Sequence, residues 1–292
     1  MADAHTQTLG LIGDPVEHSV SPLLHGHLIR ALGVNYCYHA FRVRRDELAV
    51  ALAGLKALGV KGVNVTLPHK EAVLPLLDGV SPEARAVGAV NVVVNANGRL
   101  VGYNSDVVGI ELALKRHGVD VRGHKVVVLG AGGAARAAVW ALAKMEAAGV
   151  HIHSRSLIRG ERLARELAES CGRTELSAFA WEEAAFAQSF DGAALLVNAT
   201  PCGMWPRHHE SPVAGKYLSK GLAVFDLVYN PLRTRLLREA TERGAQTIPG
   251  LDMLIFQAVE AMALWTGRRP ANEDEFVAKM RRLLSKELQG HG

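Results

Sequence analysis

Apolar runs recur through the second half of the chain, and helical segments follow three of the four. The runs lie at Val126–Leu129, Val150–His153, Leu195–Asn198 and Ala223–Leu227. Helices are predicted over 133–148, 157–170 and 231–243, after the first, second and fourth of these runs. Continuous apolar strands that alternate with helices are typical of a parallel, doubly wound sheet.

The first half has a less regular pattern. Strands are predicted near 8–12, 36–43 and 61–65, and a hairpin over 90–95 and 99–103 turns at Asn97-Gly98. Helices are predicted over 21–32, 46–58, from 69 onward and near 107–117, with Ser21 as the N-cap of the first. After Gly250 only helices are predicted, near 251–266 and 273–288. The chain is therefore expected to be an α/β protein with a mixed α/β region first.

Composition narrows the class of protein. A length of 292 residues suits two domains, and 49% hydrophobic with 21% charged residues is typical of a globular chain. The net charge of +4 comes without a long Lys/Arg run, so no nucleic-acid partner is expected. The apolar run 126–135 is too short and too rich in glycine to span a bilayer, so no membrane association is expected.

The three cysteines and the N-terminus bear on the compartment. Cys37, Cys171 and Cys202 are an odd number at unrelated spacings, which favours free thiols in a reducing cytoplasm over a zinc site. The first residues show no basic start followed by an apolar stretch, so no signal peptide is expected. We expect a cytoplasmic protein without a bound metal.

A glycine-rich turn carries the clearest chemical signal. The segment 126–135 reads Val-Val-Val-Leu-Gly-Ala-Gly-Gly-Ala-Ala, a G-x-G-x-x-[G/A] pattern between a predicted strand and a predicted helix. The glycines allow a tight turn, and amides at the helix start can face a pyrophosphate. The pattern predicts dinucleotide binding; the alternative is a tight structural turn.

The end of the next strand indicates which dinucleotide is bound. An NAD site usually has an acidic residue there, whereas this chain has His153-Ser-Arg-Ser-Leu-Ile-Arg159. Arg155 and Arg159 can hold a 2′-phosphate, and Ser154 and Ser156 can add hydroxyl donors. Cations at a helix N-terminus oppose the helix dipole, which favours an anionic ligand over two solvated arginines. The sequence predicts NADP.

Other polar residues are ambiguous by themselves. Ser19 and Ser21 could bind a carboxylate at a helix start, but Ser21 could equally serve only as a helix cap. Lys70 could be a solvated surface charge, and Asp106 could cap the helix near 107–117.

Taken together, these segments resemble the shikimate dehydrogenase family, in family order and over nearly the whole chain. The matching segments are Gly13-Asp-Pro15, His18-Ser-Val-Ser-Pro22, Asn64-Val-Thr-Leu-Pro-His-Lys70, Gly88-Ala-Val-Asn91, Gly102-Tyr-Asn-Ser-Asp106, Gly130-Ala-Gly-Gly-Ala134, Asn198-Ala-Thr200, Gly203-Met204, Asp226-Leu-Val-Tyr229 and Gly250 through Gln257.

The resemblance implies a fold and a reaction. It implies a mixed α/β substrate domain over 1–106, completed by C-terminal helices over 251–292, and a Rossmann-type NADP domain with a doubly wound parallel sheet over 107–250. The implied reaction is the reversible NADPH-dependent reduction of 3-dehydroshikimate to shikimate, a step toward aromatic amino acids. A homodimer is one possible assembly.

The resemblance also implies roles for individual residues. Lys70 and Asp106 would be the catalytic pair, and Ser19 and Ser21 would bind the substrate carboxylate. The residues expected around the substrate ring are Asn64, Thr66, Asn91, Asp106, Tyr229 and Gln257. The residues expected at the cofactor are Gly130, Ala131, Gly132, Gly133, Ala134, Ser154, Arg155, Ser156, Arg159, Asn198, Thr200, Leu227 and Gly250.

A few positions depart from the family pattern. Val92 replaces a common threonine and removes a hydroxyl near the substrate, and Ser105 replaces another threonine. Pro201 replaces a serine, Asp252 stands where glycine is frequent, and Ser154-Arg155-Ser156 replaces Asn-Arg-Thr with its phosphate-binding chemistry kept.

Val92 leaves open a variant that acts on quinate or on an aminated shikimate. Retention of the small residues Ser21 and Thr66 favours shikimate over quinate. A non-catalytic NADP-binding regulator is disfavoured because Lys70 and Asp106 are both present. A folate- or tRNA-linked reductase would have no use for the serine loop.

Overall fold

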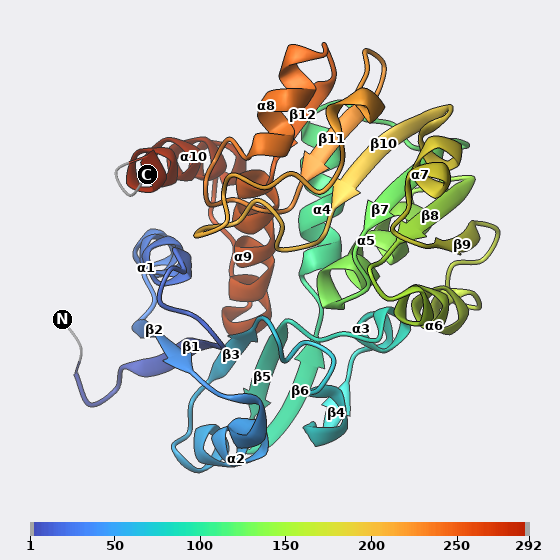
Figure 1. The fold of residues 1–292 in the computed structure, drawn as a ribbon. Helices are drawn as coiled ribbons and strands as arrows, with labels where there is room; N and C mark the ends of the chain where they lie inside the picture. The colour runs from blue at the N-terminus through green and yellow to red at the C-terminus, as the bar shows by residue number, and fades with distance from the viewer. Residues whose placement is uncertain (1–2, 290–292) are drawn as a thin grey trace. The chain divides into compact units, whose positions relative to one another are not determined.

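The protein forms two compact units in the computed structural model, which describes residues 3–289. The first unit runs to Ser105 and includes Gln257–Met280, and the second comprises Asp106–Phe256 and the chain from Arg281 onward. Helices α9 (Gly250–Thr266) and α10 (Glu273–Gln289) each contribute residues to both units. Figure 1 shows the course of the chain.

The first unit contains a mixed six-stranded sheet in the order β2-β1-β3-β5-β6-β4. Strands β2 and β3 run parallel to β1, whereas β5 is antiparallel to β3 and to β6. The strands are β1 (Gln7–Gly13), β2 (Tyr36–Arg42), β3 (Gly62–Val65), β4 (Gly79–Val80), β5 (Val92–Ala96) and β6 (Arg99–Tyr103). The helices are α1 (Ser21–Leu32), α2 (Leu48–Ala57) and α3 (Pro82–Val87), with short 3₁₀ turns η1 (Arg45–Glu47) and η2 (Leu74–Leu76).

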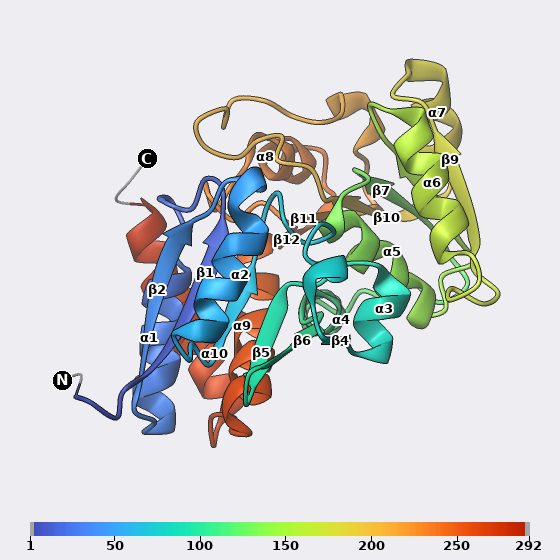
Figure 2. The same ribbon diagram turned by 90° about the horizontal axis from the view of Figure 1, so that it is seen from below.

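Side-chain alternation places different helices on the two faces of this sheet. Ile12, Val63 and Val65 point toward α2 and form a core with its residues Leu48 and Leu52. The other face meets α1 and the Gln257–Thr266 part of α9, where the ring of Trp265 leaves no room for a side chain at Gly62. Figure 2 shows α1 and α2 on either side of the strands.

The second unit contains a six-stranded, entirely parallel sheet in the order β12-β11-β10-β7-β8-β9. The strands are β7 (Lys125–Leu129), β8 (Gly149–His153), β9 (Glu175–Phe179), β10 (Ala193–Asn198), β11 (Ala223–Asp226) and β12 (Gln246–Pro249). The helices are α4 (Asp106–Arg116), α5 (Gly133–Lys144), α6 (Leu157–Leu167), α7 (Glu183–Phe190) and α8 (Arg235–Glu242), with a 3₁₀ turn η3 (Gly215–Tyr217). The chain winds outward from β7 first through β8 and β9, and then through β10 to β12.

Helices cover this sheet from both sides, as expected for a doubly wound fold. Val127, Leu196 and Val224 form a core with residues of α7 and α8. Neighbouring residues such as Val128 and Val197 point to the opposite face and are fully buried. Helix α5 packs against β7 and β8, and α4 packs on α5. The predicted fold class is confirmed.

Two local predictions are wrong. No α-helix begins at 69, because Pro75 has no amide hydrogen and the segment forms turns and the 3₁₀ turn η2 instead. Ser21 is the first helical residue of α1 rather than its N-cap, which is Val20 without a side-chain cap.

Other boundaries differ because of local capping. Helix α8 begins at Arg235 and not at 231, because the Thr234 hydroxyl accepts a hydrogen bond from the amide of Leu237 and caps it. The sequence pattern also missed β9, α7 and β12 in the second unit and β4 and α3 in the first.

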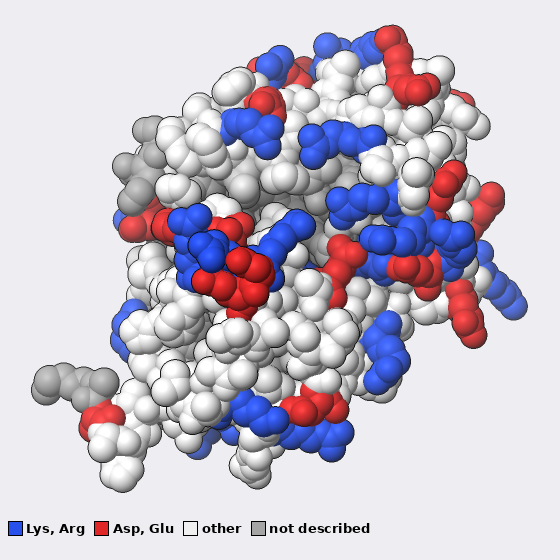
Figure 3. Space-filling model, turned by 60° about the horizontal axis from the view of Figure 1, so that its bottom comes forward, with Lys and Arg blue, Asp and Glu red and all other residues white. Residues whose placement is uncertain are grey.

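Figure 3 shows charged groups of both signs on one face of the protein. On the face shown in Figure 3, acidic side chains accompany most of the basic groups. Within residues 3–289, no helix has the length and apolar character needed to cross a bilayer.

Candidate active site

One edge of the sheet in the first unit collects the residues expected to bind substrate. The carboxyl ends of β1 and β3 meet there, because the two strands are parallel. Antiparallel pairing brings the start of β5 and the end of β6 to the same edge, with Asn64 opposite Val92 and Val92 opposite Tyr103. The serine loop after β1, the Thr66–Lys70 segment after β3, Asn91 before β5 and Ser105 after β6 therefore come from one edge.

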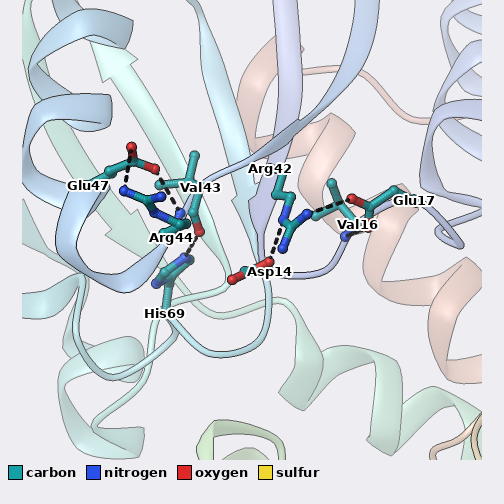
Figure 4. A network of polar contacts seen from close by, with 8 residues as sticks. All are labelled: Asp14, Val16, Glu17, Arg42, Val43, Arg44, Glu47 and His69. Atoms are coloured by element: carbon teal, nitrogen blue, oxygen red, sulfur yellow. Dashed lines mark hydrogen bonds and ion pairs between the residues drawn. The ribbon is translucent and has the colours of Figure 1, made fainter.

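The serine loop is held by short-range contacts. The Ser19 hydroxyl accepts a hydrogen bond from the amide of Ser21 at 3.2 Å, and Ser21 is buried. Figure 4 shows Arg42, at the end of β2, donating from Nε to Asp14 at 2.7 Å and pairing with Glu17 at 3.7 Å. Arg42 thus fixes the loop between β1 and α1, which contains Ser19 and leads into Ser21, the first residue of α1.

A histidine to which the sequence pattern assigned no role anchors the lysine segment. His69 is fully buried, and its Nε2 lies 2.7 Å from the carbonyl oxygen of Val43 (Figure 4). Because a carbonyl only accepts hydrogen bonds, Nε2 carries the proton. The carbonyl of Lys70 in turn accepts from the amide of Val90 at 2.8 Å. The His69 side chain and the Lys70 carbonyl thereby tie this segment to the residue after β2 and to the segment before β5.

Asn91, Ser105 and Gln257 form a buried polar cluster. The amide of Ser105 donates to Asn91 Oδ1 at 2.7 Å, and Asn91 Nδ2 donates to the Ser105 hydroxyl at 3.0 Å. That hydroxyl lies 3.4 Å from Gln257 Oε1 on α9. In the sequence Ser105 stands out only as a departure from the family pattern, yet it links two of the expected substrate residues.

Asp106 and Tyr229 belong to the second unit. Asp106 is the first residue of α4, so it belongs to the helix itself, and it is only 2% exposed. Tyr229 is half-buried in the loop that follows β11.

The expected cofactor residues lie at the carboxyl edge of the parallel sheet. In register, Leu129 pairs with His153 and Asn198, and Asn198 pairs with Asp226. The glycine turn follows β7 at the point where the winding direction of the sheet reverses, between β7 and β10. Ligands of open parallel sheets bind at this topological switch point.

The glycine turn makes a close backbone approach. Gly130 has a φ of 115°, and a Cβ atom there would lie 3.0 Å from the carbonyl oxygen of Ala199. Helix α5 begins at Gly133, so its first amides follow the turn directly. Residues 130–134 have the geometry expected of a pyrophosphate cradle.

The phosphate-selecting segment lies beside this turn. The amide of Gly130 donates to the carbonyl oxygen of His153 at 2.8 Å, and Arg159 reaches back to the carbonyl oxygen of Ala131 at 3.4 Å. Arg155 and Ser156 are exposed and Ser154 is buried. The two arginines fit a cofactor with an extra phosphate, because no carboxylate stands in 154–159 to repel it.

Asn198 supports the carboxyl edge of the parallel sheet through buried hydrogen bonds. Its side chain is fully buried, donates to Asp226 Oδ1 at 2.9 Å and accepts from the Thr200 hydroxyl at 2.7 Å. Asp226 also accepts from the Thr234 hydroxyl and from the amide of Val228. Burial raises the pKa of Asp226 to about 7, against these three donors, which lower it. This network shapes the Thr200 loop.

Gly250 and Leu227 meet closely at the same edge. A Cβ at Gly250 would lie 2.6 Å from the carbonyl oxygen of Leu227, so only glycine fits there. Among the described residues, no three His, Cys, Asp or Glu side chains gather as metal ligands.

A glycine cradle at the switch point, arginines at the end of the neighbouring strand and a separate polar sheet edge define a class of protein. These are the features of a dinucleotide-dependent oxidoreductase with its own substrate-binding unit.

Comparison with known proteins identifies the family. Residues 11–93 match the description "Shikimate dehydrogenase substrate binding domain", residues 111–185 match "Shikimate / quinate 5-dehydrogenase", and residues 250–284 match "Shikimate 5'-dehydrogenase C-terminal domain". The chain is 45% identical over 265 residues to a shikimate dehydrogenase (NADP(+)) from Moorella thermoacetica, covering 91% of this chain and 90% of that protein.

Solved structures support the same family assignment. The shikimate 5-dehydrogenase of Thermus thermophilus, in complex with NADP(H) and shikimate, has a TM-score of 0.83 at 37% identity and covers 95% of this chain and 99% of that one. The quinate dehydrogenase of Corynebacterium glutamicum, in complex with NAD, has a TM-score of 0.84 at 33% identity and covers 95% of this chain and 98% of that one.

The chain belongs to the shikimate dehydrogenase family. The family predicted from the sequence motifs is confirmed, and with it an NADP-dependent oxidoreductase that acts on a CH–OH group.

Proposed function

We propose that this protein catalyses the reversible NADPH-dependent reduction of 3-dehydroshikimate to shikimate, with the first unit as its substrate domain and the second as its NADP domain. The observation that carries the proposal is the single sheet edge of the first unit, which gathers hydroxyl, amide and ammonium groups around one place in the fold. Such a set suits a small ring bearing a carboxylate and several hydroxyls.

The roles of the substrate residues follow from their chemistry. Ser19 and Ser21 bind the carboxylate through their hydroxyls. Asn64, Thr66, Asn91 and Gln257 hold the ring hydroxyls, and Tyr229 is proposed as a further substrate residue. Preformed contacts such as those of Asn91 with Ser105 reduce the entropy lost on binding and orient the ring.

Lys70 and Asp106 carry the proton chemistry. NADPH, when bound, supplies the hydride. Negative charge develops on the substrate carbonyl oxygen in the transition state, and the Lys70 ammonium stabilises that charge and is a donor for the proton. Asp106 is proposed as the other member of the catalytic pair, with a carboxylate suited to proton transfer.

The cofactor roles follow the strand order. Gly130–Ala134 would hold the pyrophosphate, while Ser154, Arg155, Ser156 and Arg159 would hold the 2′-phosphate. Thr200, Leu227 and Gly250 would line the cofactor, with Asn198 fixing the Thr200 loop.

The decisive experiment follows the NADPH absorbance band. Purified protein is assayed with shikimate, quinate and aminoshikimate, each with NADP and with NAD. Turnover is expected to be fastest with shikimate and NADP. A folded protein that does not turn over shikimate with NADP would rule out the proposal.

Quinate oxidation is the second candidate, because the chain is similar to a quinate dehydrogenase that was solved with NAD. The absence of an acidic residue in 154–159 argues against NAD as the preferred cofactor. In the same assay, quinate with NAD exceeding shikimate with NADP would favour this candidate.

Compartment and assembly are further proposals. Cys37, Cys171 and Cys202 are free thiols, which supports a cytoplasmic location. A homodimer is proposed as the assembly, and light scattering coupled to size-exclusion chromatography measures it directly.

A further inference from the structure

Tyr38 lies on β2 and contacts Asn64, one of the residues expected to bind the substrate. Its side chain is buried, with 8% of the residue exposed. The Tyr38 hydroxyl donates to Asn64 Oδ1 at 2.7 Å, a length typical of a well-formed O–H···O bond. Asn64 lies on β3, two strands from β2 in the sheet order.

A second contact fixes which way the Asn64 amide faces. Its Nδ2 donates to the carbonyl oxygen of Asn91 at 3.2 Å. A flipped amide would set two carbonyl oxygens against each other, so the Asn91 carbonyl decides the orientation. The Tyr38 hydroxyl then holds the amide in place from the oxygen side.

Tyr38 packs in a cluster with two other rings. His25 of α1 stacks on the phenol with ring centroids 4.2 Å apart and planes 7° from parallel. Trp265 of α9 lies against both rings, and its indole Nε1 donates to the carbonyl oxygen of Val93 at 3.0 Å. The phenol therefore has little freedom to swing away from Asn64.

His25 contributes as a neutral ring. It is fully buried, and neither of its ring nitrogens makes a hydrogen bond of normal geometry. Burial lowers its pKa to about 3, against a smaller effect of the nearby Asn64 side chain, which raises it. Because its ring nitrogens are unpaired, His25 makes no polar contact that would explain its place in the core. Its visible contribution is the stacking of its ring on Tyr38.

We propose that Tyr38 is a positioning residue for substrate binding: it locks the Asn64 amide so that its second N–H is presented to a substrate hydroxyl. The inference rests on the proposed function, in which Asn64 holds a ring hydroxyl. Without Tyr38, Asn64 keeps its orienting contact with Asn91 but loses the partner that fixes its position.

The test is Tyr38→Phe, which removes one oxygen atom. Losing one partner of a buried hydrogen bond is expected to raise the KM for shikimate about tenfold. We expect kcat to change less than about twofold and the KM for NADP to stay the same, because no reacting group is touched. Tyr36→Phe, on the same strand, is the matched control and should leave all three constants unchanged.

A double-mutant cycle separates positioning from general packing. In an Asn64→Ala background, Tyr38→Phe should raise the KM for shikimate no further. An equal loss in both backgrounds, or no loss in the otherwise wild-type protein, would overturn the proposal.

A rescue variant covers the case in which Tyr38→Phe does not fold. 4-Aminophenylalanine at position 38 keeps the ring and offers a weaker N–H donor. The KM for shikimate of this variant should lie above the wild-type value. In the Asn64→Ala background the same replacement should not raise that KM, and a rise there would contradict the inference. If the wild-type protein fails to oxidise shikimate, the proposed function itself is wrong.

Discussion

Single polar residues of the first unit are held in place by protein partners before any ligand binds. Asn91 exchanges two hydrogen bonds with Ser105, and Ser19 is bonded to the amide of Ser21. Groups held in this way lose little freedom when a substrate binds, which is how positioning lowers a barrier. The family pattern predicted these residue types, but their orientations depend on partners such as Ser105 and His69.

Val92 shows why a departure from a pattern needs a structure. From the sequence alone, the change from threonine indicates the loss of a hydroxyl near the substrate. The side chain is fully buried in β5. A threonine hydroxyl there would need a hydrogen-bond partner inside the unit, so the change concerns the buried interior.

Lys70→Ala should lower kcat for shikimate oxidation by roughly 10² to 10⁴, the usual contribution of a positioned acid–base group. Shikimate affinity should change far less, because the serines and amides remain. Steady-state kinetics with calorimetric binding measures both. Lys61→Ala is the matched control. A Lys70→Ala enzyme with full activity would show that Lys70 has no catalytic role.

Asp226→Asn should change how stability depends on pH. The folded-state pKa of Asp226 is about 7 and lies above its ordinary value of 3.8, so the folded protein holds this proton more tightly. The contribution of Asp226 to stability is therefore full below about pH 4 and is lost as the pH rises through about 7. Asparagine does not ionise, and its side-chain oxygen can still accept from Asn198 and the amide of Val228, while its NH2 group would donate to the Thr234 hydroxyl instead of accepting from it.

Urea unfolding from about pH 5 to about pH 8 measures this difference. The variant should gain stability over the wild-type protein as the pH rises. Parallel profiles for the two proteins would show that Asp226 stays ionised throughout.

At the scale of elements, strand direction decides where chemistry gathers. Parallel strands bring the ends of β7, β8, β10 and β11 to one edge, and this edge carries the glycine turn, the arginine segment and the Thr200 loop. Apolar runs predicted these strands well, because strands buried on both faces leave a strong sequence signal. The half-exposed β9 and the short β4 have no such signal and were missed.

The segment at the start of α6 should discriminate between the two cofactors. Arg155→Ala removes a cation proposed to meet the 2′-phosphate, which NAD lacks. We expect the KM for NADP to rise about tenfold or more, with little change in the KM for NAD. Arg165→Ala, exposed on the last turn of α6, is the matched control. Equal effects of Arg155→Ala on both cofactors would argue against phosphate recognition.

The whole molecule is assembled from two units, each with its own sheet and core. The units are not consecutive pieces of chain, because α9 and α10 supply residues to both. Gln257 therefore reaches the polar cluster of the first unit after the whole parallel sheet has been completed.

NADP should stabilise the whole chain through mass action. At about 100 times its Kd, a ligand that binds only the folded state adds about 2.7 kcal/mol, which would raise the Tm by roughly 5 °C or more in a chain of this size. Thermal unfolding with NADP, NAD or no cofactor measures it. NAD at the same concentration should shift the Tm less, and equal shifts would contradict the predicted cofactor preference.

The sequence by itself determined the fold class, the family and the types of residue at both sheet edges. Periodicity encodes burial, and glycine, arginine and serine at fixed spacings encode local backbone and charge requirements. Only the tertiary structure decided which groups orient them. Tyr38 and Asn64 lie 26 residues apart, and Ser105 and Gln257 lie 152 apart. Contacts between distant segments depend on strand order and packing, which no local pattern records.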